Sequence, residues 1–165
     1  MAPSRIALLQ RMPVFGAIAQ PALEFLVGQA GTVQVAAGDC FFREGEVADR
    51  MYVLEAGRVE VFRCWQGREL TLCTLGAGDC FGEMALLDLA PRSAGVRALE
   101  TAIAMQISAA DLFALFERDP EQFALIQMNL AREMSRRLRA TDEQLFRLWL
   151  GADAVVAAPP DFRAA

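Results

Sequence analysis

The tetrapeptide Gly78-Asp79-Cys80-Phe81 repeats an earlier Gly38-Asp39-Cys40-Phe41 in the middle of the chain. Gly and Asp are typical turn residues, so each Gly-Asp pair is expected to introduce a strand. Two matching corners within a series of short antiparallel strands favour a jelly roll over an open sheet. The repeat therefore predicts a jelly-roll barrel for this part of the chain.

Outward from this repeat, residues 32–107 contain short β runs punctuated by glycine. The clearest runs are 32–35, 51–54, 59–62, 70–75 and 102–107. Residues 65–69, which separate two of them, are predicted to form a hairpin loop. Residues 4–30 and 109–150 are helical in pattern. We therefore predict an α+β fold, an antiparallel β jelly-roll barrel with N-terminal helices and a long C-terminal helix. One domain then covers residues 1–150, and 151–165 form a flexible tail.

The last helix is predicted to be unusually long. Asp119 is a suitable N-cap, Pro120 suits the first helical position, and Gly151 ends the pattern. Apolar residues follow one stripe, which Thr141 continues: Phe123, Ile126, Leu130, Met134, Leu138, Leu145 and Leu148. About 30 residues make a rod of roughly 45 Å, longer than a small domain is wide. We expect a homodimer through the 120–150 helix; the alternative is a helix packed wholly on its own barrel.

Composition excludes several classes of function. The 165 residues contain neither His nor Lys and carry a net charge of −5. Without His there is no Ser-His-Asp or Cys-His site, and no enzyme is predicted. The acidic balance argues against nucleic acid binding, and no apolar run is long enough to span a membrane. We expect a cytoplasmic protein whose four cysteines, which lack CxxC spacing, are small buried apolar residues rather than metal ligands.

Residues 81–94, Phe-Gly-Glu-Met-Ala-Leu-Leu-Asp-Leu-Ala-Pro-Arg-Ser-Ala, carry the chemistry. Gly82 permits close approach of a ligand to the backbone, and residues 83–87 can form one helical turn with N–H groups directed at an anion. Arg92 offers two parallel donors to a phosphate, and Ser93 adds a hydroxyl. Glu83 is an acceptor suited to a sugar hydroxyl. Together these groups describe a site for a ribose carrying a single phosphate.

This segment resembles the phosphate-binding cassette of the cyclic nucleotide-binding domain family, which reads F-G-E-hydrophobic-small-hydrophobic-hydrophobic, a loop, then P-R-small-A. Residues 38–45 and 51–59 also resemble barrel turns of that family, so the resemblance covers roughly 6–150. It implies that the ligand is bound by these cassette residues: Phe81, Gly82, Glu83, Met84, Ala85, Arg92, Ser93 and Ala94.

Residues 133–143 resemble the dimer helix of the bacterial catabolite activator family. The resemblance implies that Thr141 contacts the adenine amino group and that Arg137 supports the ribose end. Asp142 stands where the family has a hydroxyl that reaches the partner subunit's base, which leaves the identity of the base open. Ser93 occupies the position where cGMP-selective relatives often carry Thr, so cAMP is favoured over cGMP as ligand.

The resemblance implies a receptor module that converts cyclic nucleotide binding into movement of its C-terminal helix, without a cofactor or metal. Fifteen residues follow Leu150, too few for the DNA-binding domain of the catabolite activators, so a stand-alone module acting on an unidentified downstream protein is expected. Two alternatives are a nucleotide-independent dimeric scaffold and a haem or iron–sulfur sensor on the same fold. The intact cassette argues against the first, and the missing His against the second.

Overall fold

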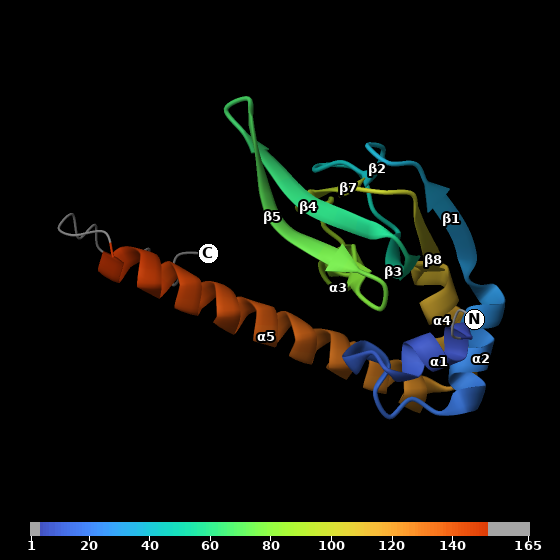
Figure 1. Ribbon diagram of the computed structural model, residues 1–165. Coiled ribbons are helices and arrows are strands. Elements are labelled where there is room, and N and C mark those ends of the chain that lie inside the picture. Colours follow the sequence, from blue (N-terminus) through green and yellow to red (C-terminus); the bar gives the residue numbers. More distant parts are fainter. Residues whose placement is uncertain (1–3, 152–165) are drawn as a thin grey trace. The chain divides into compact units, whose positions relative to one another are not determined.

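The computed structural model describes residues 4–151, shown in Figure 1. The chain divides into two compact units, one ending at Leu130 and one beginning at Ala131, and each is described by itself. The helices of the first unit are α1 (Arg5–Gln10), the 3-10 turn η1 (Pro13–Phe15), α2 (Gln20–Gln29), α3 (Met84–Asp88), α4 (Ala109–Arg118) and the start of α5 (Pro120–Gly151). Its strands are β1 (Gly31–Val35), β2 (Cys40–Phe42), β3 (Arg50–Ala56), β4 (Arg58–Trp65), β5 (Arg68–Gly76), β6 (Cys80–Phe81), β7 (Gly95–Ala98) and β8 (Ala102–Ser108).

The strands form two four-stranded sheets, and the pairings within both are antiparallel. One sheet has the order β1-β8-β3-β6 and the other β2-β7-β4-β5. Apart from the β4–β5 hairpin, the neighbouring strands of both sheets are not consecutive in the chain, as in a jelly roll. The predicted α+β class, with helices before and after an antiparallel jelly roll, is therefore confirmed.

Alternating side chains give the first sheet two buried faces. On β3, Tyr52 and Leu54 point between the sheets, whereas Met51 and Val53 point toward the helices. Successive side chains of a strand project to opposite faces, and this alternation explains why neighbouring β3 residues belong to different clusters. The cluster between the sheets has these members: Phe42, Tyr52, Leu54, Val59, Phe81, Val96, Ala98, Ala102 and Ala104. The cassette strand β6 lies at the edge of this layer.

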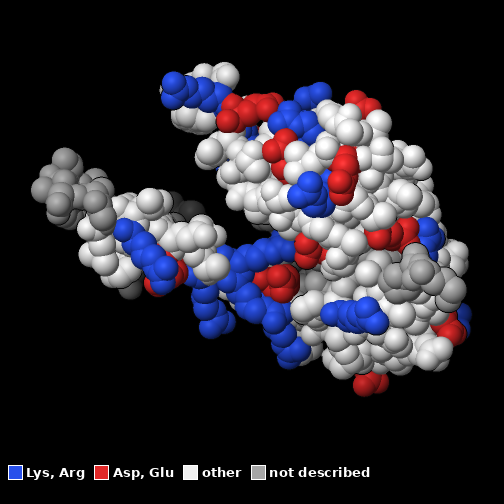
Figure 2. Space-filling model, in the orientation of Figure 1, with Lys and Arg blue, Asp and Glu red and all other residues white. Residues whose placement is uncertain are grey.

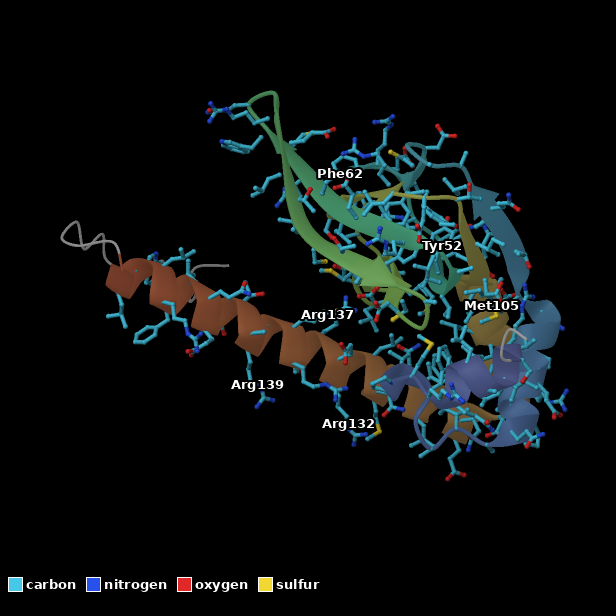
Figure 3. All side chains as sticks on the ribbon, in the orientation of Figure 1. Tyr52, Phe62, Met105, Arg132, Arg137 and Arg139 are labelled. Atoms are coloured by element: carbon cyan, nitrogen blue, oxygen red, sulfur yellow. The ribbon has the colours of Figure 1, made fainter. Side chains whose placement is uncertain are left out.

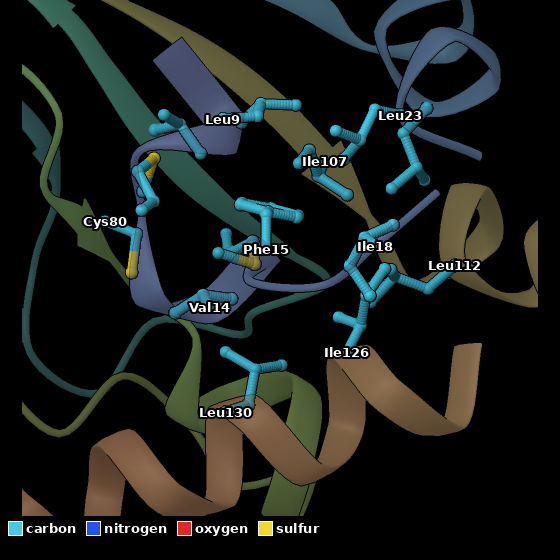
Figure 4. Packing of buried hydrophobic residues seen from close by; sticks show 14 of the residues in the cluster. Leu9, Val14, Phe15, Ile18, Leu23, Cys80, Ile107, Leu112, Ile126 and Leu130 are labelled. Carbon is cyan, nitrogen blue, oxygen red and sulfur yellow. The ribbon is translucent and has the colours of Figure 1, made fainter. Parts of the chain in front are cut away.

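The helices cover the other face of the first sheet. Figure 4 shows Ile107 of β8 in one buried cluster with helix residues, among them Phe15, Leu23, Leu112 and Ile126. The α5 residue Asn129 is buried nearby, and its amide donates hydrogen bonds to the carbonyls of residues 14 and 16, at 3.2 and 2.9 Å. The first third of the α5 stripe thus packs on its own domain. The homodimer through the 120–150 helix stays a prediction.

Several local predictions are confirmed by capping and turn contacts. The Ser108 hydroxyl accepts from Asp111 N, and the Asp111 carboxylate accepts from Ser108 N, which together make a capping box for α4. Asp119 caps α5 through a hydrogen bond from Gln122 N. The predicted 65–69 loop is too long, because strand pairing continues to Trp65 and Arg68. The turn consists of Gln66 and Gly67, both with positive φ, which suits the twist of a two-residue hairpin.

The cysteine prediction is wrong for two of the four residues. Cys80 is buried and Cys40 half-buried, but Cys64 and Cys73 are exposed on the β4–β5 hairpin. This hairpin extends beyond the neighbouring strand β7, which pairs only with residues 59–62 of β4. Cys64 lies on this outer part of the hairpin. Cys73 lies opposite Val61, within the stretch that β7 pairs with, but on the edge strand β5, whose residues 68–74 are all exposed.

The second unit consists of the remainder of α5. Its large apolar side chains are exposed within this unit, among them Leu138 at 62% and Leu148 at 69%. No helix within residues 4–151 combines the length and apolar character that a membrane span requires. The predicted flexible tail, apart from Gly151, lies outside the described residues.

Candidate functional site

The cassette is a continuous turn that leaves one sheet and enters the other. β6 pairs with Tyr52 and Val53 of β3, and the chain then turns at Gly82, whose φ is +77°. Glu83 is the N-cap residue of α3, which begins one residue later than predicted, and Leu89 ends the helix in a left-handed conformation. The chain then reaches Arg92 just before β7. Glu83 and Arg92 thus lie at the two ends of a ten-residue segment that connects the two sheets.

Arg92 is buried, with only 6% of its surface exposed. Its Nη1 donates a hydrogen bond of 2.9 Å to the carbonyl oxygen of Gly82. Its guanidinium carbon lies 3.9 Å from the centre of the Phe42 ring and 5.7 Å from that of Tyr52. Burial lowers the pKa of the guanidinium from its usual value, with the charge of nearby Arg50 acting in the same direction. Arg92 is thus a desolvated cation held within the first unit.

The Nε of Arg92 is buried and has no hydrogen-bond partner within residues 4–151. The nearby carboxylate of Asp49 forms a bidentate ion pair with Arg50, at 2.8 and 2.9 Å. Leaving a buried donor unsatisfied costs about 1–3 kcal/mol, and more when the group is charged. The buried N–H group at Nε can therefore donate a hydrogen bond to an anion.

The other cassette residues divide between a buried and an exposed side. Glu83, at 2% exposure, Ala85, Phe81 and Ala94 are buried. Met84 and Ser93 are exposed, and the Ser93 hydroxyl lies 3.6 Å from the Met84 sulfur as its donor. The structure thus brings Arg92 together with Gly82, and Ser93 together with Met84. Among residues 4–151, Glu83 and Arg92 form no hydrogen bond or ion pair with each other.

Two parts of the site were missed by the sequence analysis. The aromatic rings of Phe42 and Tyr52, from β2 and β3, form the surface below the guanidinium, and Figure 3 marks Tyr52. The turn after β2 holds the Arg92 backbone: Gly45 N donates to Arg92 O at 2.8 Å, and Arg92 N donates to Glu46 O at 2.9 Å. Gly45 has a φ of +84°, and a glycine after a strand was the one available signal for this turn.

The predicted base contacts lie in the second unit. Thr141 and Asp142 are exposed there, and the Thr141 hydroxyl donates to the Arg137 carbonyl at 3.0 Å. The Arg137 side chain lies 3.5 Å from Glu133. Figure 3 shows it projecting from α5, as Arg132 and Arg139 do. Contact between these residues and a ligand in the cassette stays a prediction.

Ion pairs neutralise much of the charge elsewhere in the first unit. Arg97 contacts both Glu60 and Glu69, at 2.7 and 2.9 Å, and hydrogen bonds to both carboxylates raise its pKa. Figure 2 shows acidic and basic side chains interspersed over the visible face. These surface arginines have carboxylate partners. Arg92, in contrast, makes no ion pair with any residue in 4–151.

Comparison with known proteins decides the family. Residues 32–119 match the family model described as "Cyclic nucleotide-binding domain". The chain belongs to the cyclic nucleotide-binding domain family. The match covers both sheets from β1 to β8 and includes the whole cassette. Domains of this family are regulatory and not enzymatic, as predicted.

The relatives include bacterial regulators. The "Cyclic AMP receptor protein" of Thermus thermophilus is 38% identical over 109 residues, which are 66% of this chain and 49% of that protein. The "CRP-like cAMP-activated global transcriptional regulator" of Mycobacterium tuberculosis is 31% identical over 139 residues, 84% of this chain and 60% of the relative. A crystal structure of the Thermus thermophilus catabolite activator protein superposes with a TM-score of 0.73 at 34% identity, covering 82% of this chain and 62% of that one.

The chain therefore spans about half to two thirds of the length of these relatives. The cyclic nucleotide-binding domain is the part that they share with it. The stand-alone arrangement and the domain limits of 1–150 and 151–165 stay predictions.

Proposed function

We propose that the chain is a cytoplasmic cAMP receptor module in which Arg92 binds the cyclic phosphate and Glu83 the ribose. The observation that carries the proposal is the buried Nε of Arg92, which lacks a hydrogen-bond partner within residues 4–151. Folding has removed this cation from water without giving it an ion pair with any residue in 4–151, although the charges of Asp49 and Glu46 act on it, so it can still bind an anionic ligand. A cyclic phosphodiester carries one negative charge, which matches a single arginine.

The phosphate contact would use the guanidinium edge that Gly82 does not occupy. Nη1 is bonded to Gly82 O, which leaves Nε and Nη2 as two parallel donors, the geometry that suits two phosphate oxygens. The site excludes water already, since Arg92 is buried, and hydrogen bonds to charged groups are stronger there than in water. The amide groups at the start of α3 would add further donors.

Glu83 supplies the second recognition element. It is a buried acidic residue at the N-cap of α3, one residue after the glycine that binds Arg92. An ionised carboxylate only accepts hydrogen bonds, so it suits the free 2′-hydroxyl of a cyclic nucleotide ribose and would repel an additional phosphate there. This pairing favours a nucleoside 3′,5′-cyclic monophosphate over a 2′-phosphorylated nucleotide.

Base recognition and signal output are proposed for α5. Thr141 and Arg137 would approach the adenine and the ribose end, and Asp142 would accept from the adenine amino group. Helix movement on binding would be the output, because a ligand shifts an equilibrium toward the arrangement it binds more tightly. With Ser93 after Arg92, cAMP is preferred over cGMP, which remains the second ligand to test.

A homodimer through the 120–150 helix completes the proposal. Ile126 and Leu130 are buried in their own domain, but Leu138, Leu145 and Leu148 are exposed in the second unit. Exposed apolar side chains that recur along one helical stripe favour a helix–helix seam. The downstream protein is not identified by these residues. Sedimentation of Leu138→Glu should show a shift toward monomer, and an unchanged dimer would remove α5 from the seam.

The receptor function is tested by calorimetric titration of Arg92→Ala with cAMP and cGMP. Two charge-assisted hydrogen bonds of about 1.5–3 kcal/mol each are lost, so the Kd for cAMP should rise by roughly hundredfold or more. Arg68→Ala is the matched control, since Arg68 is exposed on β5 away from the cassette, and its Kd should equal that of the wild type. An unchanged Kd for Arg92→Ala contradicts the proposal. A wild-type melting temperature that ignores millimolar nucleotide would instead favour the nucleotide-independent scaffold.

A further inference from the structure

We infer that Phe42 is a positioning residue for ligand binding. Its ring packs against the flat face of the Arg92 guanidinium and leaves the N–H groups of Nε and Nη2 available to the phosphate. The inference rests on the proposed phosphate contact of Arg92 and adds a residue outside the cassette. Phe42 lies fifty residues before Arg92 in the chain and reaches it only through the fold.

The contact between the two side chains is close and buried. The guanidinium carbon is 3.9 Å from the Phe42 ring centre, well inside the range of about 6 Å within which cation–π attraction is significant. Phe42 is 7% exposed, so neither partner is screened by much water. Tyr52 lies on the same cation at 5.7 Å and contributes less, because the attraction falls with distance.

The ring and a phosphate would use different parts of the guanidinium. A π system attracts the planar cation through its face, whereas hydrogen bonds run in the plane of the guanidinium through its N–H groups. The Phe42 contact therefore does not compete with an anion for Nε. The ring also offsets part of the desolvation that burial imposes on the cation and that lowers its pKa. Phe42 can consequently remain in place before and after the ligand binds.

The position of Phe42 is set by surrounding structure. A register irregularity between Cys40 and Phe42 places Phe42 opposite Val96, which is buried between the sheets. Its ring packs against those of Tyr52 and Phe81, at 5.7 and 6.1 Å between centres. The turn that follows at once, through Gly45 and Glu46, bonds the Arg92 backbone. One short segment, 42–46, thus holds both the main chain and the side chain of the arginine.

The chain offers a matched control for this role. Phe41 belongs to the same aromatic group, edge-on to Tyr52 at 5.5 Å and to Phe81 at 5.0 Å, but it has no cation–π contact with Arg92. Phe41→Leu and Phe42→Leu therefore remove the same ring from the same cluster. Only the second removes the face contact to the cation.

The experiment is calorimetric titration of both variants with cAMP. Phe42→Leu should raise the Kd about tenfold, equivalent to about 1.4 kcal/mol, within the range for a desolvated cation–π contact. Phe41→Leu should stay within about twofold of the wild type. In an Arg92→Ala background, Phe42→Leu should have no further effect on the Kd, because the interaction partner is already gone.

Equal effects of the two leucine variants, or additivity of Phe42→Leu with Arg92→Ala, would overturn the inference and reduce Phe42 to packing. If Phe42→Leu does not fold, Phe42→Met replaces it, since a flexible thioether fills the space without a ring. Wild-type protein that binds neither cAMP nor cGMP contradicts the proposed function itself. Wild-type binding with indistinguishable leucine variants contradicts only the role of Phe42.

Discussion

Substitution of Gly82 by alanine should have two effects that can be measured separately: backbone strain lowers the stability of the fold, and displacement of Arg92 weakens phosphate binding. A Cβ at this position would lie 2.5 Å from Arg92 Nη1 and 3.3 Å from the Phe42 ring. The first distance is shorter than any real Cβ contact, so an atom must move. The far end of an arginine side chain moves more easily than backbone, and we therefore expect the guanidinium to leave its place by about 1 Å.

The two effects have different sizes. Gly82 has a φ of +77°, and an alanine held in the left-handed region costs about 1–2 kcal/mol. For a chain of this size that lowers the Tm by roughly 2–8 °C. Displacement of the guanidinium breaks its 2.9 Å hydrogen bond to Gly82 O and misaligns the free edge. Loss of one charge-assisted contact of about 1.5–3 kcal/mol raises the Kd roughly ten- to hundredfold.

Thermal unfolding and calorimetric titration with cAMP measure the two effects independently. Gly38→Ala is the control, because Gly38 has a similar φ of +89° but no atom within 4 Å of its Cβ position. It should lose similar stability and keep the wild-type Kd. The reasoning is refuted if Gly82→Ala binds cAMP as the wild type does, or if both alanine variants weaken binding equally.

Three further predictions concern stability. Gly95→Ala places a Cβ 2.6 Å from the buried Phe62 ring, and overpacking should cost about 1–3 kcal/mol in urea unfolding; a cost below 0.5 kcal/mol would mean that the ring moves freely. Asn129→Ala deprives the buried Val14 carbonyl and the part-buried Gly16 carbonyl of their donor and should cost about 1–3 kcal/mol by the same measurement, whereas wild-type stability would show that water replaces the amide. Hydrogen bonds from Arg50 to Asp49, and from Thr71 and Arg97 to Glu60, hold both carboxyl pKa values below their usual range. Their stabilisation is complete above about pH 5 and is lost as the pH falls below about 4, so the Tm should fall there; with no His in the chain it should stay level from pH 6 to 8, and a step in that interval contradicts this account.

The cassette was predictable because its residues are contiguous. Gly82, Glu83 and Arg92 lie within eleven residues, so their spacing is visible without knowledge of any long-range contact. The helix caps at Ser108 and Asp119 were predictable for the same reason, since a cap depends on a residue and the backbone three positions later. The hairpin loop was predicted too long because a two-residue turn at Gln66-Gly67 needs strand register to locate it.

Exposure was less predictable than structure. Cys64 and Cys73 are small apolar residues within strands, yet both are exposed. Cys64 lies on the part of the hairpin beyond β7, and Cys73 lies on the edge strand β5. The apolar stripe of α5 is continuous in sequence, but Ile126 is buried in its own domain and Leu138 is exposed in the second unit. Periodicity indicates which residues share a face; it does not indicate what that face meets.

By itself the sequence determined the fold class, the cassette and the residues that carry charge in it, because each depends on local spacing and on strand and helix periods. Only the tertiary structure decided how Arg92 is held, with Phe42 under its face and the turn through Gly45 at its backbone. The physical reason is register: a shift of one residue in β2 would direct the Phe42 ring to the opposite side of the sheet, and that register is set by pairing with β7, more than fifty residues along the chain.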